Sequence, residues 1–275
     1  MRAKVPPFAA LRYLLTKDDR TENFYRLQYE RFFARHCDRE AGCLKVGPLN
    51  LPRLSHAEFP TREEAYYAME IGDILYPAVL DSYWYVDEGP YEWAGVAIEP
   101  EDVVFDCGAN LGIFSLLAAY RGATVFAFEP IAAAREMLSQ TLSLNPDLAQ
   151  RIEIVPAALS DAEGTAEFTV LDGTLVGSSM VLPQTGRRER AEMTTVDAFC
   201  AKRGVEPDFI KADIEGAERK MLAGAKATLS RCAPKLAVCT YHLPDDKKVL
   251  RELVLRGNSE YVISEKWKKM YACVK

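Results

Sequence analysis

The stretch that decides the fold of this chain is Val103-Val104-Phe105-Asp106-Cys107-Gly108-Ala109-Asn110-Leu111-Gly112-Ile113-Phe114-Ser115. Its apolar beginning predicts a buried strand, its small residues predict a tight turn, and its apolar end predicts the start of a helix. Glu129 follows the next apolar run, so that strand, glycine turn, helix, strand and acid succeed one another. This order is typical of a nucleoside-cofactor site in a doubly wound α/β fold.

Apolar runs and helical patterns alternate along the chain after residue 100. Strands are predicted over residues 103–107, 124–128, 152–155, 209–213 and 236–240. Helices are predicted over residues 112–120, 130–144, 195–204, 215–230 and 246–255. Because the strand segments are continuously apolar, we expect a mostly parallel sheet that helices cover on both faces, as in Rossmann-like α/β folds. Two late strands, over residues 261–264 and 271–274, are expected to form a hairpin at the sheet edge.

Two segments between these elements have a different composition. Residues 167–171 predict an added strand. Residues 172–193 are rich in Gly, Ser and charge, so we expect a loop there. Its basic cluster of Arg187, Arg188 and Arg190 is interpreted as a solvated part of that loop.

The composition excludes several classes of protein. The chain has 275 residues, is 49% hydrophobic and carries a net charge of -6, which argues against a general nucleic-acid binder. No apolar run approaches the ~18 residues of a membrane span, so we expect no stable membrane insertion. Seven scattered cysteines without a CxxC pair favour reduced thiols and a cytoplasmic protein. His36, Cys37 and Cys43 lack a fourth ligand, so we expect no metal site. The sequence is also compatible with a homodimer.

The glycine turn also discriminates between cofactors. A nicotinamide dinucleotide site would show G-x-G-x-x-G, whereas here two glycines, Gly108 and Gly112, stand four residues apart. Asp106 would repel a pyrophosphate, because such a site is built from amides that face an anion. S-adenosyl-L-methionine carries a sulfonium and an ammonium, so Asp106 can face its amino-acid end. Glu129 can accept hydrogen bonds from both ribose hydroxyls, each worth about 1.5–3 kcal/mol.

At this point the chain resembles the FkbM family of S-adenosylmethionine-dependent methyltransferases. The residues that carry the resemblance are Phe105-Asp106-Cys107-Gly108-Ala109-Asn110-Leu111-Gly112, Phe128-Glu129-Pro130, Ala157-Ala158-Leu159-Ser160-Asp161, Phe209-Ile210-Lys211-Ala212-Asp213-Ile214-Glu215-Gly216-Ala217-Glu218 and Tyr241-His242. Each motif alone is weak, but their order is specific. The residues before about 80 carry no match.

The resemblance implies a Rossmann-like class I methyltransferase fold with a central, mostly parallel, seven-stranded sheet. We expect the methyltransferase domain over residues 81–275 and a helical N-terminal extension or cap over residues 1–80. The implied cofactor is S-adenosyl-L-methionine, and the implied reaction is O-methylation of a sugar or secondary-metabolite hydroxyl on a small-molecule acceptor. The implied cofactor-binding residues are Asp106, Gly108, Ala109, Asn110, Gly112, Glu129, Ala158, Leu159 and Asp161. Helix–strand packing is the alternative explanation for the two glycines, and a surface acid at a strand end is the alternative for Glu129.

Methyl transfer to a hydroxyl requires in-line placement and benefits from a base within hydrogen-bond reach. His242, Asp213 and Glu215 follow core strands at their carboxyl ends, where ligands bind in open α/β sheets. We expect His242 to be the base, because an imidazole titrates near working pH, and a structural histidine is the alternative. Asp213 and Glu215 are expected to orient the acceptor or the methionine end of the cofactor. A divalent cation, or for Glu215 a helix N-terminus, would also suit these acids.

Other side chains are candidates for the acceptor side. Ser178 and Ser179 lie in the 172–193 loop, and an aromatic patch precedes the first core strand. The patch comprises Tyr83, Trp84, Tyr85, Tyr91 and Trp93, together with Glu92. It either packs the N-terminal segment on the core or covers the cofactor and lines the acceptor pocket. Lys211 is interpreted as a snorkelling side chain.

Two other functions remain open from the residues alone. A nicotinamide-dependent oxidoreductase is disfavoured by Asp106 and by the missing third glycine. A non-catalytic binding or scaffold protein could use the same fold without methyl transfer.

Overall fold

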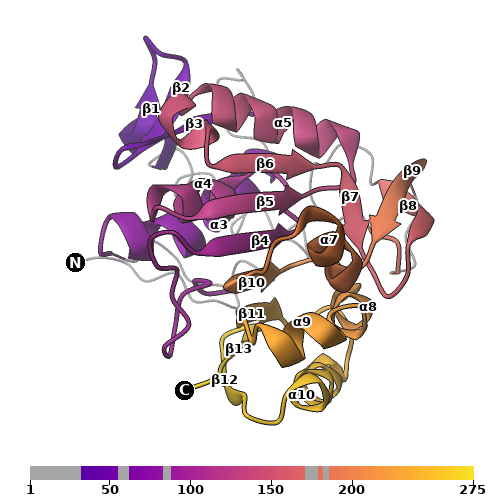
Figure 1. The fold of residues 1–275 in the computed structure, drawn as a ribbon. Coiled ribbons are helices and arrows are strands. Elements are labelled where there is room, and N and C mark those ends of the chain that lie inside the picture. The colour runs from indigo at the N-terminus through magenta and orange to yellow at the C-terminus, as the bar shows by residue number, and fades with distance from the viewer. Residues whose placement is uncertain (1–31, 55–61, 83–87, 171–178, 182–185) are drawn as a thin grey trace. The chain divides into compact units, whose positions relative to one another are not determined.

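The computed structural model of the chain describes residues 32–54, 62–82, 88–170, 179–181 and 186–275 (Figure 1). The chain divides into two units, residues 1–90 and residues 91–275. The second unit contains all the motifs of the expected cofactor site. The boundary expected from the sequence, between residues 80 and 81, lies within the first of these units.

The apolar strands of the second unit form one seven-stranded sheet (Figure 1). Its parallel strands are β4 (Val103–Cys107), β5 (Thr124–Phe128), β6 (Ile152–Val155), β10 (Phe209–Ala212) and β11 (Lys235–Cys239). The late strands β12 (Val262–Lys266) and β13 (Lys269–Cys273) form the expected hairpin, and β13 pairs antiparallel with β11. The strand order β12-β13-β11-β10-β4-β5-β6 confirms the predicted mostly parallel sheet.

The order of the strands reverses at β4. The chain runs from β4 outward through β5 and β6, and it later returns to place β10 and β11 on the other side of β4. At such a switch point the connections leave in opposite directions, and ligands bind in the crevice at the carboxyl ends of the strands. The topology therefore brings the turn after β4 next to the loop after β10.

Helices cover both faces of this sheet (Figure 1). On one face lie α7 (Val196–Arg203), α8 (Glu218–Ala223), α9 (Lys226–Arg231) and α10 (Asp246–Gly257). Their apolar side chains, such as Phe199 and Leu222, join Phe105 and Val238 of the sheet in one buried cluster. On the other face, Phe114 of α4 (Ile113–Tyr120) packs on Phe209 with ring centroids 5.9 Å apart. The helices α5 (Ala132–Ser143) and α6 (Pro146–Ala149) lie beside α4.

The expectation of a loop over residues 172–193 is wrong for its last part. Arg187–Thr194 forms β9, which lies between β7 (Ala157–Leu159) and β8 (Gly164–Val170) in a separate three-stranded sheet. The charges of β9 misled the prediction because they point to solvent, while Glu189, Ala191 and Met193 alternate with them and are half-buried. Arg188 pairs with Glu167 of β8 at 3.4 Å, so this part of the basic cluster is neutralised across the strands.

The single helix expected over residues 215–230 is also wrong. The segment forms two short helices, α8 and α9, and helical structure begins only at Glu218. Glu215 and Gly216 both adopt positive φ angles, 54° and 94°, which no right-handed helix contains. Glu215 therefore belongs to an irregular loop at the end of β10, and its expected place at a helix N-terminus does not exist.

The described part of the first unit contains a helix and a small sheet. Residues 32–36 are helical, and the earlier part of the expected N-terminal extension, residues 1–31, lies outside the described residues. An antiparallel sheet of β1 (Cys37–Asp38), β2 (Cys43–Val46) and β3 (Leu49–Pro52) precedes α3 (Arg62–Val79). Both ring nitrogens of His36 have hydrogen-bond partners within the protein: Nδ1 lies 2.6 Å from Lys45 O, and Nε2 lies 2.5 Å from Tyr76 Oη.

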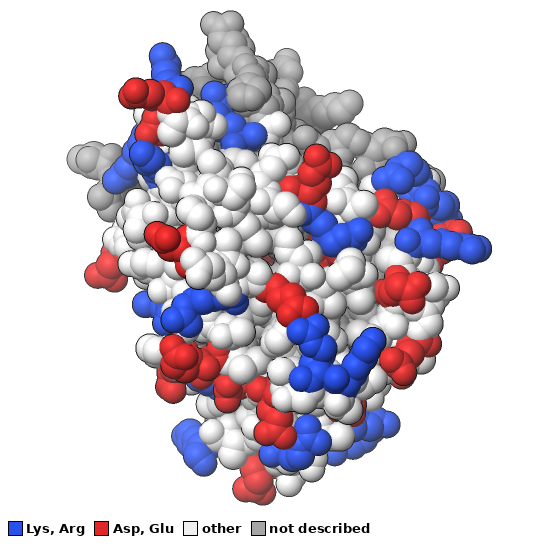
Figure 2. Space-filling view, turned by 45° about the horizontal axis from the view of Figure 1, so that its top comes forward, with Lys and Arg blue, Asp and Glu red and all other residues white. Residues whose placement is uncertain are grey.

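Charge and hydropathy agree with the composition. On the face drawn in Figure 2, positive and negative side chains are interspersed. Among the described helices, none combines the length and the apolar character that a bilayer crossing demands. All seven cysteines lie in described residues, and none of them forms a disulfide.

Candidate active site

The turn after β4 is held by its own backbone against two neighbouring strands. The amides of Gly108 and Ala109 both donate to Phe128 O at 3.0 Å, which ties the turn to the end of β5. Gly108 has φ 78°, and a Cβ atom there would stand 2.0 Å from Asp213 O, so no other residue fits without movement. Asn110 also adopts a left-handed φ of 48°, a conformation that stores strain in a residue other than glycine. The turn is thus narrow, strained and in direct contact with the loop after β10.

Gly112 serves packing. It has φ 81° at the start of α4, and a Cβ atom there would meet Leu138 Cδ1 of α5 at 2.1 Å. The alternative explanation considered for the glycines therefore applies to Gly112, with a helix rather than a strand as its neighbour. Gly108 differs because the atom it would strike is backbone of the acid loop.

Asp106 is fully buried, and both of its carboxylate oxygens have partners. Ser115 Oγ donates to Oδ2 at 2.6 Å, and Lys211 Nζ lies 2.9 Å from Oδ1. The pair forms because β4 and β10 align Asp106 directly beside Lys211. Burial alone would lower the pKa of Lys211, but the carboxylates of Asp106 and Asp213 outweigh burial and raise it. The negative charge of Asp106 is therefore neutralised within the protein.

The interpretation of Lys211 as a snorkelling side chain is wrong. Its ammonium is buried and donates to Gly108 O at 2.6 Å in addition to its pairing with Asp106. A side chain on a central strand of a sheet that is covered on both faces cannot reach water, so its charge needs a partner inside the protein. Lys211 consequently fixes both the charge and the shape of the glycine turn.

Glu129 lies at the end of β5 with its carboxylate turned toward the same turn. The amides of Asn110 and Ile131 donate to its two oxygens, each at 2.9 Å. Burial raises the pKa of Glu129, and these amide hydrogen bonds oppose that rise. Because a carboxylate oxygen carries two lone pairs, each oxygen can accept a further hydrogen bond. Glu129 is thus a buried, oriented acceptor and not a surface acid.

The three residues expected beside the adenine have different surroundings. Ala158 belongs to a small apolar cluster with Ile131 and Ala134, which places it close to the segment after Glu129. Leu159 points into the main core, and Asp161 is exposed and accepts a hydrogen bond from Ser160 Oγ at 3.1 Å. Only Ala158 of the three is brought toward Glu129 by the fold.

Asp213 follows β10 and is partly accessible, with 22% of its side chain exposed. Tyr91 Oη donates to its Oδ2 at 2.8 Å. Burial alone would raise the pKa of Asp213, but the positive charges of Lys211, His242 and Lys269 hold it below the usual value. Asp213 is therefore a partly accessible, ionised carboxylate with three cationic side chains near it.

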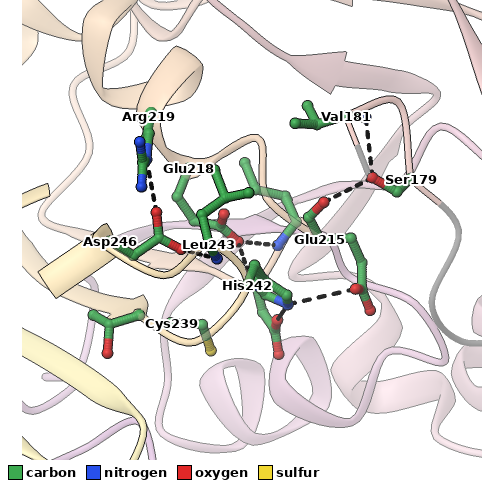
Figure 3. A network of polar contacts seen from close by, with 12 residues as sticks. Ser179, Val181, Glu215, Glu218, Arg219, Cys239, His242, Leu243 and Asp246 are labelled. Carbon is green, nitrogen blue, oxygen red and sulfur yellow. Dashed lines mark hydrogen bonds and ion pairs between the residues drawn. The ribbon is translucent and has the colours of Figure 1, made fainter. Parts of the chain in front are cut away.

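Glu215 is the second accessible acid, with 30% of its side chain exposed. Its strained backbone is held by Ser179, whose Oγ donates to Glu215 O at 2.7 Å and accepts from Val181 N at 3.0 Å (Figure 3). Ser179 is buried, so this candidate for the acceptor side supports the loop instead. Ser178 lies outside the described residues.

His242 lies behind these acids, in the loop after β11. Only 3% of its side chain is exposed, and its Nε2 stands 3.4 Å from Glu215 Oε2 and 3.6 Å from Asp213 Oδ1 (Figure 3). Its Nδ1 lies 3.1 Å from Glu218 Oε1. Burial alone would lower the pKa of His242, but the carboxylates of Glu218, Asp213 and Glu215 outweigh burial and raise it to about 9. The ring is therefore an imidazolium at neutral pH.

The loop that carries His242 is fastened by a second set of charges. Asp246, at the start of α10, accepts from Leu243 N at 2.7 Å and from Arg219 Nε of α8 at 2.7 Å (Figure 3). The ring of Tyr241 lies against that of His242 with centroids 4.2 Å apart. These contacts fix the backbone around the imidazolium.

The acids and the histidine also bear on metal binding. Asp213, Glu218 and His242 offer ligand atoms that all lie within 4.8 Å of one another. A cation there would have to displace the proton of His242, since a metal-bound imidazole is neutral. The ion pairs of the imidazolium account for this grouping.

The aromatic patch is divided between several tasks. Tyr91 reaches the site through Asp213, whereas Trp93 packs on Tyr271 with ring centroids 5.4 Å apart. Glu92 accepts from Ile98 N at 3.0 Å and pairs with Arg121, so it closes a local loop. Tyr83, Trp84 and Tyr85 lie outside the described residues.

Sequence reasoning missed Lys211 and Glu218 as members of the site, and it named Tyr91 only as part of the aromatic patch. The position of Lys211, two residues before Asp213 on a predicted central strand, could have suggested a buried partner for Asp106. No local signal connects Tyr91 with Asp213, because their contact joins residues 122 positions apart.

The sheet order and the placement of the site define a class I methyltransferase fold. An FkbM methyltransferase structure from Methylobacillus flagellatus KT shares this fold, with a TM-score of 0.52 and 18% identity, over 93% of this chain and 60% of that chain. The family model described as "Methyltransferase FkbM domain" matches residues 106–261, more than half of the chain. The chain therefore belongs to the FkbM methyltransferase family.

Two curated proteins are similar in sequence. The 31-O-demethyl-FK506 methyltransferase FkbM of Streptomyces tacrolimicus is 29% identical over 206 residues, which are 62% of this chain and 77% of that protein. The AMB antimetabolite synthetase AmbE of Pseudomonas aeruginosa is 38% identical over 109 residues. That match covers 38% of this chain but only 5% of AmbE.

Proposed function

We propose that this methyltransferase uses S-adenosyl-L-methionine to methylate a hydroxyl group on a sugar or secondary-metabolite small molecule. Membership of the FkbM family supports methyl transfer. The name of the Streptomyces relative, a 31-O-demethyl-FK506 methyltransferase, supports a hydroxyl acceptor. The observation that carries the proposal is the contact of Gly108 with Asp213 O, because it joins the cofactor turn to the acid–histidine cluster at one sheet edge.

The residues at that edge suit this cofactor. When bound, S-adenosyl-L-methionine supplies a methyl group already activated by its sulfonium. Glu129 presents two oriented oxygens that can accept from the ribose hydroxyls. Because Lys211 neutralises Asp106, we assign the recognition of the positively charged amino-acid end to Asp213, which is ionised and partly exposed. We therefore assign this role to Asp213 at the end of β10 and not, as expected from the sequence, to Asp106 in β4.

We assign the acceptor proton to Glu215. It is the more exposed of the two acids, and Ser179 fixes its backbone. A carboxylate within hydrogen-bond reach of the hydroxyl can accept its proton as the oxygen–carbon bond forms, an effect worth about 10²–10⁴-fold for general bases. Asp213 is the weaker candidate, because the surrounding cations lower its pKa.

His242 then acts differently from the base expected from its position in the sequence. Its nitrogens are enclosed and it is protonated at neutral pH, so an acceptor hydroxyl meets Glu215 first. The imidazolium holds the side chains of Asp213 and Glu215 by charge from behind. We therefore propose His242, Asp213 and Glu215 as the catalytic group, with the proton transferred to Glu215.

Calorimetry and a transfer assay test this function. We expect S-adenosyl-L-methionine to bind and NAD to give no heat, and Glu129→Ala to weaken cofactor binding strongly. With a panel of hydroxylated small molecules, we expect S-adenosylhomocysteine to form together with a methyl ether. Binding of NAD alone would support an oxidoreductase. Cofactor binding without turnover on any acceptor would favour a scaffold protein.

The remaining expectations are part of this proposal. They are a cytoplasmic protein, a small-molecule acceptor, no nucleic-acid partner, a possible homodimer and no required metal. The residues of the methyltransferase domain are proposed to begin at 81, and those of the N-terminal extension to end at 80.

A further inference from the structure

Glu218 is a buried acid that the proposed reaction does not use. It is the first residue of α8, and its side chain has no exposed surface. Its Oε1 accepts from Ile214 N at 2.8 Å, which fastens the carboxylate to the loop after β10 (Figure 3). Burying a carboxylate without a positive partner costs free energy, so we expect a positively charged side chain next to Glu218.

The positive partner of Glu218 is the imidazolium of His242. Its Nδ1 lies 3.1 Å from the same Oε1 atom of Glu218, within hydrogen-bond distance. Its Nε2 stands on the opposite side of the ring, at 3.4 Å from Glu215 and 3.6 Å from Asp213. These two distances are long for hydrogen bonds, so Glu218 provides the close contact that sets the direction of the ring.

We propose that Glu218 is the positioning residue of the site. By holding His242 through Nδ1, it aims Nε2 between the two acids that face the substrate. The same carboxylate holds Ile214, so one side chain couples the ring to the strained loop that carries Glu215. Its catalytic consequence rests on the proposed function, whereas the orientation and charge of His242 do not.

Charged and aromatic groups of the described residues face His242 from three parts of the chain. Glu218 comes from α8, Asp213 and Glu215 come from the loop after β10, and the Tyr241 ring comes from the loop of His242 itself. Lys211 and Lys269 face Asp213, and Lys268 lies 5.2 Å from the Tyr241 ring. Glu218 is the nearest acid and the only one of the three that is wholly enclosed, so removing its charge should change His242 most.

A histidine titration by NMR tests this role in the ligand-free protein. The chain has three histidines, and the signal of His242 is the one that disappears in His242→Gln. We expect the pKa of His242 to be about 9 in the wild type and to fall to about 8 or below in Glu218→Gln, because a charged partner is removed. Glu206→Gln, which alters an exposed acid paired with Arg231, is the control and should leave the titration unchanged.

Further variants keep the test decisive. If Glu218→Gln does not fold, Glu218→Asp retains the charge but withdraws it by one methylene, and the pKa of His242 should lie below that of the wild type. A titration identical to the wild type in either folded variant would overturn the proposal. In the transfer assay, Glu218→Gln should lower kcat more than it raises the KM of the acceptor, and Glu218→Asp should restore part of kcat. If no acceptor is methylated while His242 titrates as expected, the function fails and the role of Glu218 stands.

Discussion

The turn after β4 and the loop after β10 are built alike but treat charge in opposite ways. Each follows a buried parallel strand, and each contains a residue other than glycine with a left-handed backbone, Asn110 in one and Glu215 in the other. The acid of the first, Asp106, is enclosed and paired with Lys211. The acids of the second, Asp213 and Glu215, keep part of their surface open.

This difference in charge separates the residues that hold the shape of the site from those that can act on a ligand. A buried ion pair such as Asp106–Lys211 holds a shape and offers no charge to a ligand. Acids that are held at one side and open at the other can meet a positive ligand or accept a proton. We therefore expect changes in the first region to lower stability, and changes in the second to lower activity.

The largest expected effect is on turnover, in Glu215→Gln. Removing the proton acceptor should lower kcat about 10²–10⁴-fold, while the free energy of unfolding should change by less than about 1 kcal/mol, because the side chain is partly exposed. Steady-state kinetics and urea unfolding measure the two quantities. Glu265→Gln on the edge strand β12 is the matched control. Full activity in Glu215→Gln would assign the proton to another group.

The converse is expected for Lys211→Met. It leaves the carboxylate of Asp106 buried and unpaired, so the free energy of unfolding should fall by about 3–5 kcal/mol. Replacing both partners, in Asp106→Asn with Lys211→Met, should recover a large part of that loss. Denaturant unfolding of the single and double variants gives the coupling energy. Additive losses would show that the pair does not act as a unit.

Gly108→Ala tests the contact between the two regions. Its Cβ would press on Asp213 O at a positive φ, so overpacking and backbone strain should together lower the free energy of unfolding by about 2–4 kcal/mol. Cofactor affinity should fall with it. Gly204→Ala is the control, because its φ is also positive at 63° but nothing lies within 4 Å of the new Cβ. Equal losses in both variants would attribute the effect to backbone conformation alone.

The last expected effect on stability is its dependence on pH. The pKa of His242 is about 9 in the folded protein and near 6.5 when unfolded, so its contribution is complete below about pH 6.5 and is lost as the pH rises through about 9. Since one unit of pKa shift is worth about 1.4 kcal/mol, we expect the wild type to lose about 3 kcal/mol across this range, and His242→Gln to lose less. Parallel pH curves would contradict the assignment of the charge.

Activity adds a second use of the same titration. If the imidazolium supports Glu215, kcat should fall as the pH rises through about 9, where His242 loses its proton. A rise in kcat through the same range would instead make neutral His242 the base. Addition of a chelator should leave kcat unchanged, and restoration by Mg²⁺ after a loss would show that a cation occupies the acids.

Much of the fold follows from local patterns. The bounds of β4, β5 and β6 coincide with the apolar runs, because each strand of a parallel sheet is buried on both faces. Thr195 and Gly204 mark the ends of α7 by capping, which is a local interaction. The patterns failed at β9, where an alternating charged face resembles a loop, and at residues 215–217, where strain interrupts a helical sequence.

The site could be predicted only in part, because its motifs are local in the sequence but its charge pairings are not. Gly108 and Glu129 stand in sequence motifs, and the structure places both at one turn. The pairing of Asp106 with Lys211 depends on which residue of β10 lies beside it in the sheet, and this register is a long-range property. The protonation of His242 depends on three acids that fold around it, so its type and position in the sequence could not predict it.

The sequence by itself determined the α/β fold, the turn of small residues and the family, because strand burial and steric limits at a glycine act over a few neighbouring residues. The tertiary structure alone decided which charges are neutralised and which remain open to a ligand. Electrostatic state depends on burial and on partners from distant strands, and those are set only when the sheet is assembled.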